Sequence, residues 1–109
     1  MEYLKEYNGN ITNKMINGLK KLGSFYNDFA IGKGIKEDFY YYTQDRKNFK
    51  IIYSIIVDNN INKMSIGKIM TEPVNAKIED NATDLIREFI KNIEKIEGLR
   101  GKFTKNDFI

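Results

Sequence analysis

The sequence predicts an α+β fold in the order helix, strand, strand, strand, helix. Two segments, one toward each end, space their apolar residues three and four apart, which places them on one face of a helix. Between these segments, three runs rich in strand-forming residues are separated by short turns that contain Asp and Asn. Because short turns join antiparallel neighbours, we expect a three-stranded antiparallel meander flanked by an N-terminal and a C-terminal helix. The length is that of one domain, so residues 1–109 are predicted to form a single compact domain.

The N-terminal helix is predicted from an apolar stripe that starts at Ile11. Either Asn10 or Thr12 can cap its first turn by accepting a backbone N–H. The stripe repeats at gaps of three and four and consists of Ile11, Met15, Leu19, Leu22, Tyr26 and Phe29. Since these gaps are close to a heptad pattern, self-association through the stripe is an alternative to packing on the sheet, and the choice between monomer and homodimer stays open.

Two glycines leave a second interpretation of this segment open. Gly18 and Gly23 each destabilise a helix by about 1 kcal/mol relative to alanine. The alternative is a helix that ends near Gly23, followed by a strand with Phe25, Phe29 and Ile31 on one side. We favour the longer helix.

The three strands are predicted from their residue types and their alternation. Phe39–Thr43 is followed by the turn Asp45–Asn48 and then by Phe49–Val57. The middle of Phe49–Val57 is apolar on both sides, which is typical of a central strand with both faces at least partly covered. After a second turn, a third strand is expected over Ile61–Thr71, where Gly67 indicates a bulge.

The C-terminal helix has the clearest periodic pattern in the chain. Asp80 or Asn81 is expected to cap its start, and its apolar and charged faces continue to about Glu97. Gly98 is expected to end it as a C-terminal cap. The tail Gly98–Ile109 contains further apolar residues and is a candidate for a short extra strand docked on the sheet.

The chain contains neither histidine nor cysteine, and this excludes several classes of function. Imidazole and thiolate are the usual ligands of zinc and of most transition metals, and histidine is the usual proton carrier near neutral pH. We therefore expect no metal, no cofactor and no enzymatic activity. The one enzymatic alternative is a small ribonuclease without histidine, for which Glu37, Tyr42, Arg46 and Lys47 are the available groups.

The formal net charge of +3 does not by itself indicate a nucleic-acid partner. Lysine, isoleucine and asparagine are all heavily used, as a genome rich in A and T would produce whatever the partner is. The longest apolar run, Ile51–Val57, is far shorter than the roughly 20 residues of a membrane-spanning helix. No secretory signal precedes it, so we expect a cytoplasmic protein that does not bind a membrane.

The run of three consecutive tyrosines is the most unusual local feature. In a strand, Tyr40 and Tyr42 share one face and Tyr41 lies on the other, so one set is expected in the core and the other exposed. We predict that Tyr40 and Tyr42, with Arg46 and Lys47 of the adjoining turn, contact a partner, because rigid aromatic rings and cations are good interface anchors. The alternative is that tyrosine is present for its strand propensity and that the charged turn is simply solvated.

These observations favour a small binding protein that acts by stoichiometric contact with a target protein. An inhibitor or accessory protein of a phage or mobile element, such as an inhibitor of host defence, would fit this size and composition. The alternative is a nucleic-acid-binding module that uses the same aromatic and basic face of the sheet.

Overall fold

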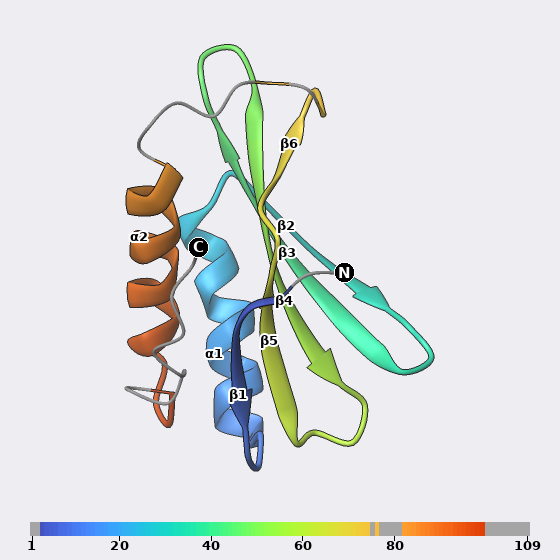
Figure 1. Ribbon diagram of the computed structural model, residues 1–109. Coiled ribbons are helices and arrows are strands. Elements are labelled where there is room, and N and C mark those ends of the chain that lie inside the picture. Colours follow the sequence, from blue (N-terminus) through green and yellow to red (C-terminus); the bar gives the residue numbers. More distant parts are fainter. Residues whose placement is uncertain (1–2, 75, 77–81, 100–109) are drawn as a thin grey trace.

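The protein is built around one antiparallel sheet that carries both of its helices on the same side (Figure 1). The computed structural model describes residues 3–74, 76 and 82–99. Its elements, in chain order, are β1 (Tyr3–Asn8), α1 (Asn13–Leu22), the 3-10 turn η1 (Gly23–Phe25), β2 (Asp28–Lys33), β3 (Glu37–Asp45), β4 (Lys50–Asp58), β5 (Lys63–Gly67), β6 (Met70–Glu72) and α2 (Ala82–Glu94).

The strands are arranged in the order β1-β5-β4-β3-β2, and β6 pairs with β4 as well. The prediction of a three-stranded meander flanked by two helices is therefore wrong, because the described part of the chain contributes six strands to the sheet. The central hairpin is as predicted, with Tyr42 of β3 opposite Tyr53 of β4. The predicted third strand is divided after Gly67 into β5, which pairs with Ile55–Val57, and β6, which pairs with Lys50–Ile52.

The favoured long N-terminal helix is also wrong, and the shorter alternative is closer to the structure. Thr12 caps α1 by accepting the Met15 backbone N–H at 3.3 Å, and the helix ends at Leu22. Gly23 lies against the Phe29 ring, where a Cβ at residue 23 would be only 2.8 Å from Phe29 Cβ. The chain turns back there, and Phe29 belongs to the edge strand β2.

The strand β1 was missed because its partner is remote in the sequence. Its sequence, Tyr-Leu-Lys-Glu-Tyr-Asn, does not alternate apolar with polar residues, and its pairing with β5 places Tyr7 opposite Met64. No residue pattern near β1 in the sequence identifies β5 as its partner strand. The sequence around β1 therefore gives no signal strong enough to distinguish a strand from a loop.

The core lies between the helices and the sheet, so α1 packs on its own sheet rather than offering its stripe to a second copy. Met15, Leu19 and Leu22 of α1 are buried against it. Tyr53 of β4 stacks on Phe89 of α2, with ring centroids 4.6 Å apart. The opposite face of β4 is buried as well, as expected for a central strand, and this face includes Ser54 and Ile56.

The C-terminal helix forms, but α2 ends at Glu94, three residues before the predicted end near Glu97, so Gly98 lies beyond the helix and does not cap it. Gly98 has a positive φ of 92°, and Leu99 N–H donates to the Ile96 carbonyl oxygen just after the helix. The expected caps Asp80 and Asn81 lie outside the described residues, and so does most of the tail proposed as an extra strand. No helix in the described ranges has both the length and the apolar character needed to cross a membrane.

Candidate functional site

Two of the four predicted contact residues lie in the core. Tyr40 and Tyr42 are 2% and 0% exposed, so they face the helices rather than a partner. The Tyr42 hydroxyl donates to the Leu19 carbonyl oxygen at 2.8 Å, and burial raises the pKa of this phenol. The expectation that these rings are exposed is wrong, and substitution of Tyr42 cannot separate binding from stability.

The other two predicted residues are exposed. Arg46 and Lys47 form the turn between β3 and β4, where the Arg46 backbone N–H donates to the Phe49 carbonyl oxygen at 2.8 Å. Glu37, named for the ribonuclease alternative, lies at the opposite end of β3 and opposes Asp58 of β4. The structure thus does not bring the four groups of that alternative together.

The rings on the helix-free face of β3 are Phe39 and Tyr41. They stack nearly parallel, at 8° between planes, with centroids 6.1 Å apart, and both are partly exposed. Both faces of β3 are aromatic, so alternation alone cannot tell which face packs on the helices.

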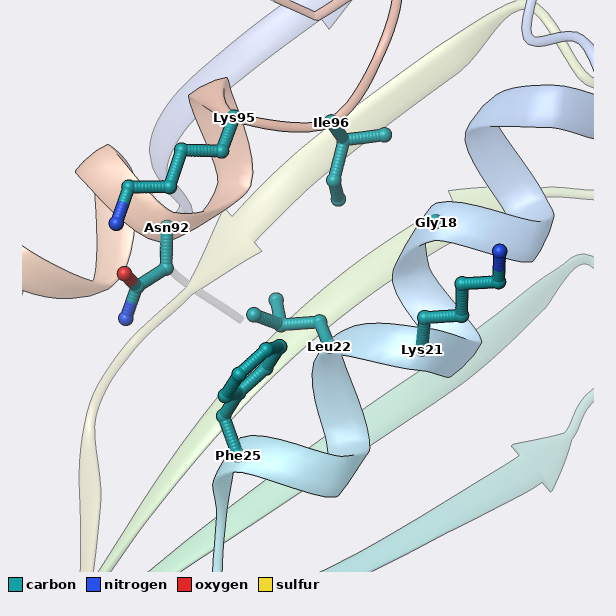
Figure 2. Close-up of a pocket in the computed structure, with 7 residues that line it drawn as sticks. All are labelled: Gly18, Lys21, Leu22, Phe25, Asn92, Lys95 and Ile96. Atoms are coloured by element: carbon teal, nitrogen blue, oxygen red, sulfur yellow. The ribbon is translucent and has the colours of Figure 1, made fainter.

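A groove lies between α1 and the end of α2 and is called here the α1–α2 groove. It has a volume of about 370 Å³ (Figure 2). Its lining comes from both helices and from η1, and consists of Gly18, Lys21, Leu22, Phe25, Asn92, Lys95 and Ile96. Sequence reasoning did not select this set.

The floor of the α1–α2 groove is apolar. Leu22 and Ile96 are buried, and Gly18 allows α1 to approach the chain that follows α2. A Cβ at residue 18 would lie 3.2 Å from Ile96 Cγ1 and 3.3 Å from Ile96 Cβ, inside ordinary van der Waals distance. The absence of a side chain at Gly18 therefore sets how closely the two helices meet.

The rim of the groove combines an exposed ring with cations. Phe25, in η1, is 79% exposed and lies beside Leu22 (Figure 2). Lys21 and Lys95 extend from the two helices, and neither forms an ion pair with the residues that the structure describes. The groove thus offers apolar surface next to two positive charges.

One neutral polar group completes the lining. Asn92 Nδ2 donates to the Tyr26 hydroxyl at 3.2 Å, which fixes the position of the amide. Burial raises the pKa of Tyr26, so this hydroxyl is neutral at physiological pH. Within the described ranges, no three aspartate or glutamate side chains gather closely enough to hold a metal ion.

Two sequence signals could have indicated the groove. Phe25 is a large apolar residue between Ser24 and Tyr26 that falls outside the periodic stripe of α1. Gly18 interrupts a helix that otherwise favours a side chain at that position. The pairing of Lys21 with Lys95 had no local signal, because the two residues come from different helices. Comparison of the chain with protein-family models, with curated proteins and with solved structures gave no match.

Proposed function

We propose that this protein acts by stoichiometric binding to a partner protein, without turning over a substrate, and that the α1–α2 groove receives that partner. The partner segment that fits this groove has an apolar side chain next to one or more carboxylates. The apolar group would lie on Leu22 and Ile96, and the carboxylates would approach Lys21 and Lys95. Opposite charges at the rim of an interface favour encounter and exclude basic partners.

The observation that carries this proposal is the exposure of Phe25. Leaving a phenylalanine side chain in water forgoes roughly 1.5–3 kcal/mol of burial free energy. Large rings next to a concave apolar surface are frequent anchors of protein interfaces. The lysine at residue 21 has a simpler explanation as well, because cations stabilise the C-terminal end of a helix. The same explanation covers Lys95, which directly follows the last residue of α2, but it does not cover Phe25.

The test is a selection of random peptides displayed on particles against the immobilised full chain. The selected peptides are then measured by calorimetry with three variants, namely Phe25→Ala, Lys21→Glu and Lys95→Glu. Two control variants lie outside the lining of the groove. Lys20→Glu introduces the same charge change one residue earlier on α1, and Ile35→Ala removes another exposed apolar side chain, in the turn between β2 and β3.

We expect the selected peptides to place Asp or Glu beside an aliphatic or aromatic residue. Phe25→Ala should weaken their binding by at least tenfold, which corresponds to about 1.4 kcal/mol. Each lysine reversal should weaken it several-fold and favour peptides in which the acid is replaced by lysine. Binding that survives Phe25→Ala, or that the two control variants weaken equally, would disprove the site.

A second candidate function rests on the stacked pair Phe39 and Tyr41. Phe39 and Tyr41 are partly exposed on the helix-free face, and aromatic rings on such a face can serve as platforms on which bases of single-stranded RNA or DNA stack, each worth about 1–3 kcal/mol. Binding of a single-stranded oligonucleotide should then fall steeply with salt and drop at least tenfold in Tyr41→Ala. Affinity that is flat with salt and unchanged in Tyr41→Ala would exclude this candidate.

A further inference from the structure

The strand β2 lies at one edge of the sheet and has an open side. It pairs with β3 on one side along all six of its residues, without a shift in register. No strand in the described part of the chain pairs with its other side. One row of its backbone N–H and C=O groups therefore has no strand partner, and the Phe29 N–H donates to Asp28 Oδ1 at 2.9 Å.

Natural sheets protect such an edge with proline, a bulge, a charge in the middle of the strand or a covering element. The strand β2 itself contains no proline, no bulge and no charge in its middle, and no described strand covers its open side. Its two charged residues, Asp28 and Lys33, stand at its ends, and the middle is Phe29-Ala30-Ile31-Gly32. Ala30 is exposed on the helix-free face, where its small side chain leaves the edge accessible.

We propose that two copies of this protein pair through β2, in antiparallel register about a two-fold axis at Ala30. Such an axis is perpendicular to the sheet, so both copies carry their helices on the same side. Residues that face each other then share a face of the sheet, because side chains alternate along a strand. The two sheets would become one continuous sheet.

The sequence of β2 is complementary to itself in this register. Phe29 faces Ile31 of the second copy, and Ile31 faces its Phe29, so two half-buried apolar side chains gain an apolar neighbour. Ala30 faces Ala30, Asp28 faces Gly32, and Lys33 faces Asn27, so no like charges are opposed. A shift of the axis to Ile31 would instead place Lys33 opposite Phe29, which is why we favour Ala30.

The test uses sedimentation equilibrium of the full chain over a wide concentration range. The unsubstituted protein should form dimers as its concentration rises. Ala30→Glu and Ala30→Lys should each weaken dimerisation at least about fivefold, because two like charges at about 4 Å repel by roughly 1 kcal/mol even in water. An equimolar mixture of the two variants should restore dimers. Asn17→Glu and Asn17→Lys, on the exposed surface of α1, should change nothing.

A chemical test is independent of charge. The chain has no cysteine, so Ala30→Cys introduces its only thiol. Mild oxidation should join two Ala30→Cys chains through residue 30, whereas Asn17→Cys should stay unlinked. An unsubstituted protein that stays monomeric at the highest concentration, or dimers that the Ala30 charges do not weaken, would overturn the proposal. Failure of the mixed variants to recover dimers would overturn it too, since it would show that residue 30 does not face itself.

Discussion

The close approach of α1 to the end of α2 can be tested by replacing Gly18 with alanine. In an isolated helix this change is stabilising by about 1 kcal/mol, because alanine restricts the unfolded backbone more than glycine does. Here the new Cβ would lie 3.2 Å from Ile96 Cγ1 and 3.3 Å from Ile96 Cβ, and closer still to Ile96 Cγ2. Ile96 is branched at Cβ and is 9% exposed, so it has few ways to move aside.

The two effects have opposite signs, and their sizes decide the outcome. Overpacking of this kind costs roughly 1–3 kcal/mol, which exceeds the helical gain. We therefore expect Gly18→Ala to lower the free energy of unfolding by about 1 kcal/mol. Urea unfolding followed by far-ultraviolet circular dichroism measures this change, and a constant m value would show that the comparison is sound.

A double-mutant cycle isolates the contact. Ile96→Ala removes the atoms that collide with the new methyl group and is itself expected to cost about 2–4 kcal/mol. In that background Gly18→Ala should become stabilising by up to about 1 kcal/mol, which gives an interaction free energy near 2 kcal/mol. Asn17→Ala, one residue away and exposed, serves as the control for propensity alone. If Gly18→Ala stabilises the protein equally in both backgrounds, the two helices do not meet as described.

Three other substitutions test the core and the central strands. Tyr42→Phe should lower the free energy of unfolding by about 1–2 kcal/mol in urea titrations, because it leaves the buried Leu19 carbonyl without its 2.8 Å partner. Ser54→Ala should raise it by about 1 kcal/mol, since Ser54 Oγ is buried without a hydrogen bond; a loss of stability would contradict this. Burial raises the pKa of Tyr53 to about 12, so the folded state favours the neutral phenol, and stability should be full below pH 10 and fall as the pH rises toward 12. Tyr53→Phe should reduce that alkaline loss by up to about 1.4 kcal/mol per pH unit, and an unchanged pH profile would refute the assignment.

The elements that could be predicted are those whose evidence is local. The hairpin of β3 and β4 follows from two strand-forming runs around an Asp-Arg-Lys-Asn turn, and α2 follows from its periodic apolar positions, although it ends at Glu94, before the predicted cap Gly98. The strand β1 lacks such evidence, and β2 has only the alternation of Phe29 and Ile31 that supported the shorter helix. The partner of β1 is β5, and the end of α1 is set by the contact of Gly23 with Phe29, which no residue count along the chain reveals.

The candidate site, like the fold, could be predicted from the sequence only in part. The sequence indicated that aromatic residues of β3 contact a partner. Both faces of β3 are aromatic, however, and the helices cover the face that carries Tyr40 and Tyr42. The rings left on the other face are Phe39 and Tyr41. The alternation of side chains along a strand shows that the strand has two faces. It does not show which of the two faces a helix will cover.

The sequence by itself determined that these 109 residues contain no imidazole or thiol, that Phe39–Val57 contains the central hairpin, and that a helix lies near residues 82–94. Those properties depend on residue types and on periods of two and 3.6, which act between neighbours along the chain. Only the tertiary structure decided that Lys21, Phe25 and Lys95 surround one groove and that β2 is an edge. Residues that are remote in the sequence come together when the whole chain buries its apolar faces at once. The free energy that decides this arrangement depends on all segments together, so no single segment predicts it.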